Sequence, residues 1–132
     1  MATPLQLLMV EDSDDDAQLV LVKLRRAGYN IEFIRVDNEP ELRAALEAKN
    51  WQIVVSDYSM PGFSGLKALQ ILRENDQDTP FILVSGTVGE EIAVEAMRCG
   101  ANDYIMKDNL ARLVPAIERE LRECRERADR RR

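Results

Sequence analysis

The segment LQLLMVED (residues 5–12) decides the fold, because it is an apolar run with a single polar interruption that ends in two acidic residues. Such a run is typical of a parallel strand that is covered on both faces. Ser13 follows as a predicted helix cap, and apolar residues then return at helical spacing: Ala17, Val20, Leu21 and Leu24. The chain therefore opens with a strand-then-helix unit that has acids at the carboxyl end of its strand.

Strand-then-helix units continue along the chain, five in all. The further strands are predicted at residues 31–36, 53–57, 80–84 and 103–106. The further helices are predicted at residues 40–49, after Gly65, at 90–99 and from about Asn109 onward. Residues 58–65 and 85–89 are predicted as loops. This order predicts an α/β fold with a doubly wound, five-stranded parallel sheet and helices on both of its faces. The first, third and fourth strands are nearly all apolar and suit the centre, whereas the mixed second and fifth suit the edges, which gives the strand order 2-1-3-4-5.

Three carboxylates follow the ends of central strands: Glu11 and Asp12 after the first strand, and Asp57 at the end of the third. Doubly wound sheets bind their ligands in the crevice beyond these two strand ends. The three groups would repel one another there unless a cation neutralised them. Oxygen ligands without Cys or His favour Mg²⁺, or Mn²⁺, over zinc. The alternative is that Glu11 and Asp12 belong to an acidic helix start that complements the helix dipole, which is our interpretation of residues 14–16.

Two more polar side chains are expected at the same edge of the sheet. Lys107 lies just past the fifth strand, where its ammonium could pair with a carboxylate and later with a phosphoryl oxygen. Ser85 follows the fourth strand and offers a hydroxyl. Either residue alone would be interpreted as a surface lysine or a loop serine, but five suitable groups at four strand ends indicate a site.

The composition excludes several classes of function. The 132 residues contain no histidine, which rules out histidine-dependent triads, histidine-ligated metals and a phosphohistidine on this chain. Cys99 and Cys124 are the only cysteines, have no metal-ligand spacing and are interpreted as free, partly buried thiols. No apolar run approaches the roughly 20 residues of a membrane helix, and no signal-peptide pattern is present, so we expect a cytoplasmic protein without membrane contact.

The last helix differs in charge from the rest of the chain. Residues 112–132 contain eight arginines and five acidic residues and therefore carry a net charge of +3. Because the whole chain has a net charge of −6, residues 1–111 carry −9. An acidic body argues against direct nucleic-acid contact. Apolar residues continue along the helix at spacings of three and four: Leu110, Val114, Ile117, Leu121, Cys124 and Ala128. We expect the first four to pack on the sheet within a domain of residues 1–123, and residues 124–132 to extend the helix as a basic connector or the start of a coiled coil. That extension could join two subunits or lead into an output domain after residue 132.

Four motifs occur in order and at compatible spacing: MVEDS (9–13), SDYSMPGFSG (56–65), LVSG (83–86) and GANDYIMK (100–107). Each is weak alone, but together they are specific. Over about residues 4–123 the sequence resembles the receiver domains of response regulators, the CheY-like superfamily of two-component phosphorelays. The resemblance implies the flavodoxin-like form of the fold and a phosphoacceptor signalling domain, which is not an enzyme beyond its own phosphorylation and slow dephosphorylation. A sensor histidine kinase or a histidine phosphotransfer protein would be its partner.

The resemblance also implies a role for each residue of the site. Asp57 would accept the phosphoryl group as an acyl phosphate, and Lys107 would neutralise charge on that group together with Mg²⁺. Asp12 would bind Mg²⁺ directly and Glu11 mainly through water. Asp57 and the Ser59 carbonyl would be the further metal ligands.

A second set of residues is expected to bind phosphate and transmit the signal. The backbone N–H groups of Tyr58 and Gly86 would complete the phosphate cradle. Ser85 would hydrogen-bond the bound phosphoryl group, and Tyr104 would then turn inward. The face formed by the fourth helix, the fifth strand and the fifth helix would change as a result.

Three residues depart from the usual pattern of the family. Asp108 replaces the proline that normally follows the lysine in a cis peptide, so the peptide geometry after Lys107 stays open. Gly86 stands where alanine is usual and is expected to loosen the loop. Glu11 replaces the commoner aspartate, which a water-mediated metal ligand tolerates.

Other classes of protein fit the sequence less well. A haloacid-dehalogenase-type hydrolase would use Asp12 and Asp14 as its paired aspartates, but the residue two further on is Asp16 rather than a small or β-branched one. A flavodoxin-type FMN carrier would need a Ser/Thr-rich phosphate loop after the first strand. The main alternative function is a degenerate receiver that acts as a phosphorylation-independent interaction module.

Overall fold

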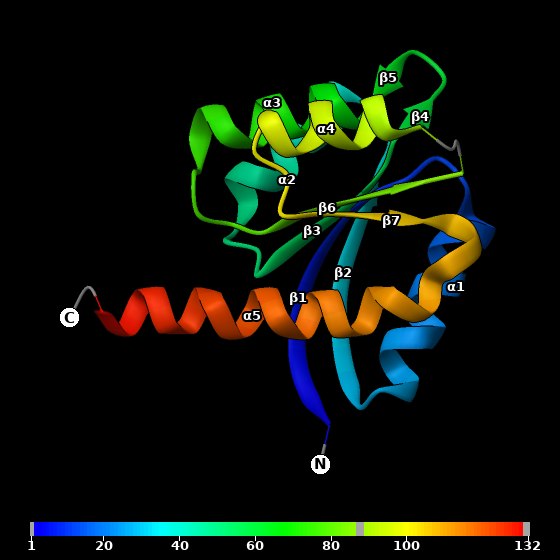
Figure 1. Cartoon of the computed structure of the whole chain (residues 1–132). Helices are drawn as coiled ribbons and strands as arrows, with labels where there is room; N and C mark the ends of the chain where they lie inside the picture. Colours follow the sequence, from blue (N-terminus) through cyan, green and yellow to red (C-terminus); the bar gives the residue numbers. More distant parts are fainter. Residues whose placement is uncertain (1, 87–88, 131–132) are drawn as a thin grey trace.

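The computed structural model describes residues 2–86 and 89–130. Its main sheet has five parallel strands in the order β2-β1-β3-β6-β7, which confirms the predicted 2-1-3-4-5 order. The strands are β1 (Thr3–Val10), β2 (Tyr29–Val36), β3 (Ile53–Asp57), β6 (Phe81–Ser85) and β7 (Asp103–Met106). The apolar strands β1, β3 and β6 lie inside the sheet, and the mixed strands β2 and β7 form its edges, as expected (Figure 1).

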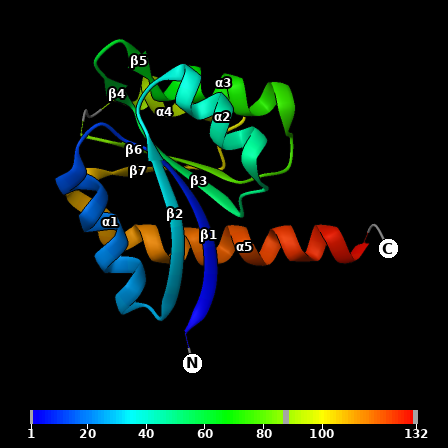
Figure 2. The same ribbon diagram turned by 180° about the vertical axis from the view of Figure 1, so that it is seen from behind.

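Helices cover both faces of the sheet (Figures 1 and 2). One face carries α1 (Asp14–Arg26) and α5 (Leu113–Arg130), and the other carries α2 (Glu39–Ala48), α3 (Gly65–Asn75) and α4 (Glu90–Arg98). Each face has its own core, because successive side chains of a strand point to opposite sides: Leu8, Val10 and Val54 pack toward α2–α4, and Leu7, Met9 and Val55 toward α1 and α5. Among the described residues, no helix combines the length and apolar character that a membrane span requires.

The last helix begins later than the sequence pattern predicts. Residues 107–112 form a 3₁₀ helix in which Asn109 has non-helical angles (φ −133°, ψ 47°), so α5 starts at Leu113 rather than near Asn109. Apolar spacing over so few residues does not separate a 3₁₀ turn from an α turn. The apolar residues of this region nevertheless pack against the core on the α1–α5 side as predicted: Leu110, Val114, Ile117 and Leu121.

The segment after β3, predicted as a loop, contains a short antiparallel hairpin of β4 (Ser59–Met60) and β5 (Phe63–Ser64). Two-residue strands leave no periodicity in a sequence, which is why the pattern does not show them. Of the other predicted loop, residues 87–88 lie outside the described residues.

Both cysteines are free, as expected, but Cys99 is exposed and only Cys124 is partly covered. Cys99 directly follows α4, in which Ala96 is the one buried residue. The expectation of a partly buried thiol is therefore wrong for Cys99 and confirmed for Cys124.

At Gly65 the start of α3 lies directly against the sheet. A Cβ atom here would clash with the Asp57 carbonyl oxygen and would lie 2.5 Å from Leu83 Cδ1. The Gly65 N–H donates to the Tyr58 carbonyl at 2.8 Å, which closes the hairpin segment. A side chain at this residue would therefore push α3 away from the end of β3, where Asp57 is located.

We expect Gly65→Ala to lower the free energy of unfolding by about 1–3 kcal/mol, the usual cost of overpacking. Gly86→Ala is the matched control, because among the described residues its Cβ would contact only Lys107 Cδ, at an ordinary 3.7 Å. The control should be neutral or stabilised by up to about 1 kcal/mol, since alanine reduces the entropy of the unfolded chain. Urea denaturation of both variants measures the difference, and equal stabilities would contradict the prediction.

Candidate functional site

The parallel register of β1 and β3 brings the predicted acids together. Val10 pairs with Ser56. Glu11, which follows β1, and Asp57, the last residue of β3, therefore lie at the same edge of the sheet. Both residues are buried, with exposed fractions of 6% and 7%. Asp12 joins them as an exposed member of the group. The sheet topology alone thus explains why residues 46 positions apart in sequence meet here.

One carboxylate oxygen from each of Glu11, Asp12 and Asp57 lies within 4.8 Å of the other two. Burial, followed by the charge of Asp57, raises the pKa of Glu11 to about 7. Ionising the whole cluster therefore costs free energy, which a divalent cation would offset. Three carboxylates are hard oxygen ligands of the kind that Mg²⁺ and Mn²⁺ prefer. These residues accordingly fit the predicted metal.

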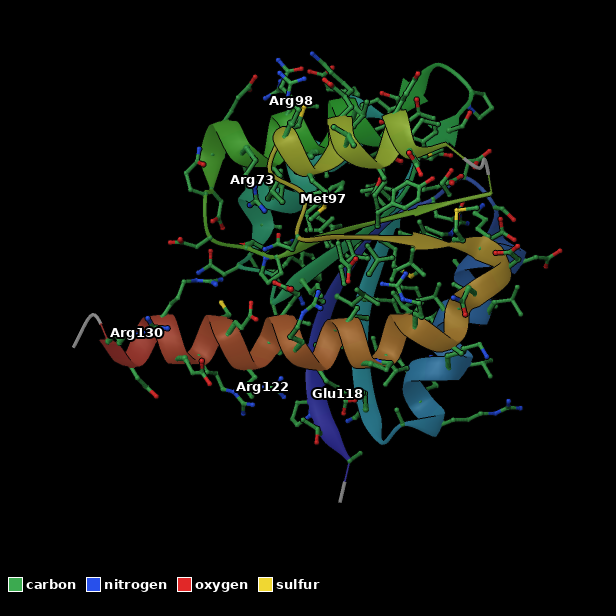
Figure 3. The ribbon with its side chains drawn as sticks, in the orientation of Figure 1. Arg73, Met97, Arg98, Glu118, Arg122 and Arg130 are labelled. Atoms are coloured by element: carbon green, nitrogen blue, oxygen red, sulfur yellow. The ribbon has the colours of Figure 1, made fainter. Side chains whose placement is uncertain are left out.

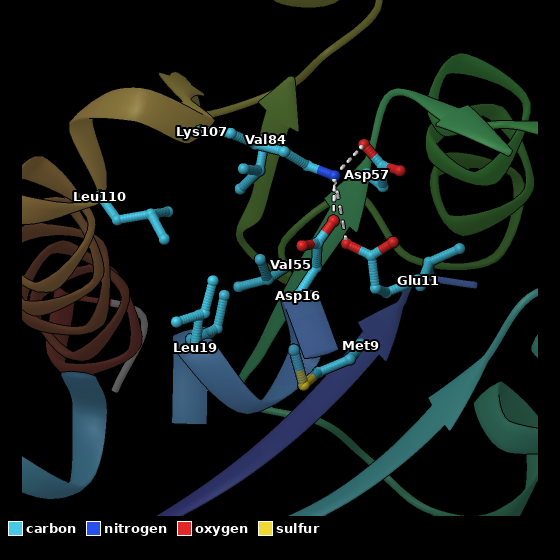
Figure 4. Close-up of a pocket in the computed structure, with 11 residues that line it drawn as sticks. Met9, Glu11, Asp16, Leu19, Val55, Asp57, Val84, Lys107 and Leu110 are labelled. Carbon is cyan, nitrogen blue, oxygen red and sulfur yellow. Dashed lines mark hydrogen bonds and ion pairs between the residues drawn. The ribbon is translucent and has the colours of Figure 1, made fainter. Parts of the chain in front are cut away.

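Lys107 is the residue that follows β7, and its side chain extends to the acids (Figure 4). Its Nζ lies 2.7 Å from Asp16 Oδ2, 3.4 Å from Asp57 Oδ1 and 3.7 Å from Glu11 Oε1. Burial alone would lower the pKa of Lys107, but the hydrogen bond with Asp16 and the charges of Glu11 and Asp57 outweigh burial and raise that pKa above its usual value. Lys107 is therefore a cation at neutral pH and offsets part of the repulsion among the acids.

Asp16 is the residue at this site that the sequence pattern does not reveal. Its place in an acidic first turn predicts only a favourable interaction with the α1 dipole. Its backbone N–H does donate to the capping Ser13 hydroxyl at 3.2 Å, but its carboxylate accepts a hydrogen bond from Lys107. The two side chains are 91 residues apart, so no local spacing could have indicated the contact.

A cavity of about 160 Å³ adjoins the site (Figure 4). Charged side chains form one end of it, and the remaining wall is apolar, with Met9, Leu19, Val55, Val84 and Leu110 among its residues. Lys107 places its ammonium at the charged end while its alkyl chain lines the cavity. Apolar surroundings lower the local dielectric constant and strengthen the ion pairs at that end.

The predicted phosphate-binding groups lie at the same edge of the sheet, but one of them, the Tyr58 N–H, already donates a hydrogen bond within the protein. Ser85 ends β6 as a buried residue, and Gly86 follows it at the surface. The Tyr58 N–H, however, donates to the Val84 carbonyl at 2.9 Å. A phosphate contact of this N–H would require the bond to Val84 to be exchanged. The roles of Tyr58, Gly86 and the Ser59 carbonyl stay predictions.

The surface formed by α4, β7 and α5 lies beside the site. Tyr104 of β7 is half-buried against the core on the α2–α4 side. Val94 and Met97 are large exposed hydrophobic residues of α4, and Met97 is labelled in Figure 3. Tyr104 thus packs on the same side of the sheet as α4, whose exposed face is partly apolar.

The peptide bond after Lys107, left open by the sequence, is trans: there is no cis peptide bond among the described residues. β7 passes at Lys107 directly into the 3₁₀ helix that leads to α5. Lys107 is therefore both the residue that contacts the acids and the first residue of the segment that leads into the last helix.

Comparison with known proteins identifies the family. Residues 7–118 match the model of the response regulator receiver domain. The chain is 37% identical over 103 residues to the C4-dicarboxylate transport transcriptional regulatory protein DctD of Pseudomonas aeruginosa, and 33% identical over 107 residues to the response regulator protein FleR of the same organism. These matches cover 77% and 81% of this chain but 22% of each relative, so the chain spans about a fifth of their length.

Solved structures show the same relationship. NtrX from Brucella abortus, in complex with ADP, has a TM-score of 0.84 at 28% identity, over 98% of this chain and 29% of that one. The signal receiver domain of a signal transduction histidine kinase from Syntrophus aciditrophicus has a TM-score of 0.76 at 27% identity, over 90% and 91% of the two chains. Together with the family match over most of its length, these similarities show that the chain belongs to the response regulator receiver domains of two-component signal transduction.

Proposed function

We propose that this receiver domain is a phosphorylation switch in which Asp57 accepts a phosphoryl group from a phosphohistidine. The observation that carries the proposal is the contact between Lys107 and Asp57 inside a cluster of three carboxylates. A nucleophile, a cation for the transferred group and ligands for a metal ion are then present in one small volume. The donor is a sensor histidine kinase or a histidine phosphotransfer protein, because this chain contains no histidine.

The metal that the site would hold is Mg²⁺, with Mn²⁺ as the alternative. The exposed Asp12 would bind it directly and the buried Glu11 mainly through water, with Asp57 and the Ser59 carbonyl as further ligands. The all-oxygen donor set supports this assignment, and so does the raised pKa of Glu11, which a neighbouring cation would lower. When bound, the ion neutralises charge on the transferring phosphoryl group.

The transfer itself needs no general base. An oxygen of the Asp57 carboxylate forms a bond to phosphorus while the nitrogen–phosphorus bond of the donor breaks, and the donor imidazole leaves with the electron pair. The product is an acyl phosphate. Lys107 already lies 3.4 Å from Asp57 Oδ1, so a small shift suffices for its ammonium to donate to a phosphoryl oxygen.

Ser85 and Tyr104 would carry the signal to the surface of α4, β7 and α5. Ser85 pairs in register with Met106, and Leu83 with Tyr104, so both residues lie on the neighbouring strands β6 and β7. Movement of the Ser85 hydroxyl toward a phosphoryl group would be followed by inward rotation of Tyr104. The surroundings of the exposed side chains on α4 would then change.

A phosphorylation-independent interaction module is the alternative function. The buried acids favour the switch, because two buried carboxylates destabilise the fold and serve no purpose in a passive module. A nucleophile, a lysine and an acid pair gathered in one crevice are typical of a site whose chemistry is used.

We expect incubation with Mg²⁺ and acetyl phosphate to add one phosphoryl group to the chain, detected by intact-protein mass spectrometry. The adduct should be stable in acid and cleaved by hydroxylamine, as an acyl phosphate is. Asp57→Asn should abolish it, because an amide is a far weaker nucleophile than a carboxylate.

Asp15→Asn is the matched control for charge, since Asp15 is exposed on the first turn of α1 and should still be phosphorylated. The absence of an adduct in the unmodified chain, or an equal adduct in Asp57→Asn, would rule out the switch and leave the interaction module.

We also propose that α5 joins two subunits or leads into an output domain. The receiver domain itself would end near residue 123. The distal half of α5 is one continuous helix that exposes Arg122, Ala128 and Arg130. Figure 3 labels Arg122 and Arg130 on this part of the helix. If Cys124 and Ala128 continue an apolar seam, Ala128→Glu should weaken self-association about tenfold, because it buries a charge between the helices. Sedimentation equilibrium measures this, and a chain that stays monomeric at millimolar concentration would contradict the dimer.

A further inference from the structure

We propose that Asp16 is a positioning residue for Lys107. It holds the ammonium beside Asp57 rather than on it, and thereby leaves the Asp57 carboxylate open to a divalent cation and to the incoming phosphorus. The inference deepens the proposed phosphoacceptor function and rests on it. The resemblance to receiver domains assigns no role to Asp16.

The three contacts of the Lys107 ammonium are unequal. The 2.7 Å distance to Asp16 Oδ2 is that of a charge-assisted hydrogen bond. The distances to Asp57 and Glu11, 3.4 Å and 3.7 Å, exceed the preferred range for such a bond. The bond to Asp16 therefore fixes where the ammonium lies, and attraction to the other two acids is secondary.

Asp16 is itself held in place by the start of α1. Ser13 is the helix cap, and its hydroxyl accepts from the Asp16 N–H. Figure 4 shows the Lys107 nitrogen between Asp16 on one side and Asp57 on the other. Asp16 stands outside the group of three carboxylates that lie within 4.8 Å of one another. Asp16 can thus hold Lys107 in place without being one of the metal ligands itself.

Replacing the Asp16 carboxylate with a neutral amide should change the position of the lysine. The ammonium borders an apolar cavity and needs a partner, and the nearest remaining carboxylates belong to Asp57 and Glu11. The flexible lysine chain would shift onto them. A direct Lys107–Asp57 pair would then compete with Mg²⁺ for the same oxygens.

Isothermal titration calorimetry with Mg²⁺ alone tests this on the whole, unphosphorylated chain. Asp16→Asn is isosteric and keeps the backbone cap, but its neutral amide oxygen is a weaker acceptor for the ammonium than the carboxylate. Circular dichroism checks that it folds. We expect it to raise the Kd for Mg²⁺ about fivefold, from the lost charge together with the competing lysine. Asp15→Asn removes the same charge from the same turn, at an exposed residue, and should raise the Kd less than about twofold.

The Lys107→Met background shows whether Asp16 acts through the lysine. With the ammonium gone, Asp16→Asn should have no more effect on the Kd than Asp15→Asn. With Lys107 present, labelling of Asp16→Asn by acetyl phosphate should be slow at limiting Mg²⁺ and should recover at saturating Mg²⁺.

Equal Kd values for Asp16→Asn and Asp15→Asn would overturn the inference. An undiminished effect of Asp16→Asn without Lys107 would overturn it as well, because Asp16 would then attract the cation directly. Failure of the unmodified chain to bind Mg²⁺ or accept a phosphoryl group would instead overturn the proposed function.

Discussion

Parallel pairing of β1 with β3 places Glu11 and Asp57 side by side in a buried crevice, where two carboxylates repel each other. The backbone cannot relieve this repulsion, since each of these strands is hydrogen-bonded to a neighbour on both sides. The positive charge that offsets this repulsion has to come from side chains of other elements and from ions in solution. Lys107 supplies one charge from the residue after β7, while burial and the charge of Asp57 still raise the pKa of Glu11. The crevice thus gathers negative charge that a divalent cation would offset, which is the ion that the proposed chemistry uses.

Much of the fold and of the site could be predicted from the sequence, because both depend on patterns that the sheet converts directly into position. Apolar runs identified β1, β3 and β6 as inner strands, and the carboxyl ends of inner parallel strands always meet at one edge. The acids at residues 11, 12 and 57 therefore had to converge, whatever the details of the loops. The lysine after the last strand followed from the same rule.

The features that could not be predicted depend on contacts that have no local signature. The bond between Asp16 and Lys107 joins the first turn of one helix to the end of the last strand. The Tyr58 N–H is engaged by the Val84 carbonyl because the chain continues its sheet hydrogen bonding one residue past β3. The 3₁₀ segment before α5 and the two-residue strands β4 and β5 are too short for any periodicity to appear.

The direct passage from Lys107 through the 3₁₀ segment into α5 gives the last helix a mechanical property. At 18 residues α5 is about 27 Å long, with its near end close to the charged site and its far end beyond the core. In a helix of that length, a small rotation at one end becomes a larger displacement at the other. A tilt of about 5° about its near end displaces its far end by about 2 Å, more than the small shift that brings the ammonium onto a neighbouring oxygen. Whatever protein surface or domain contacts the far end would therefore experience an amplified displacement.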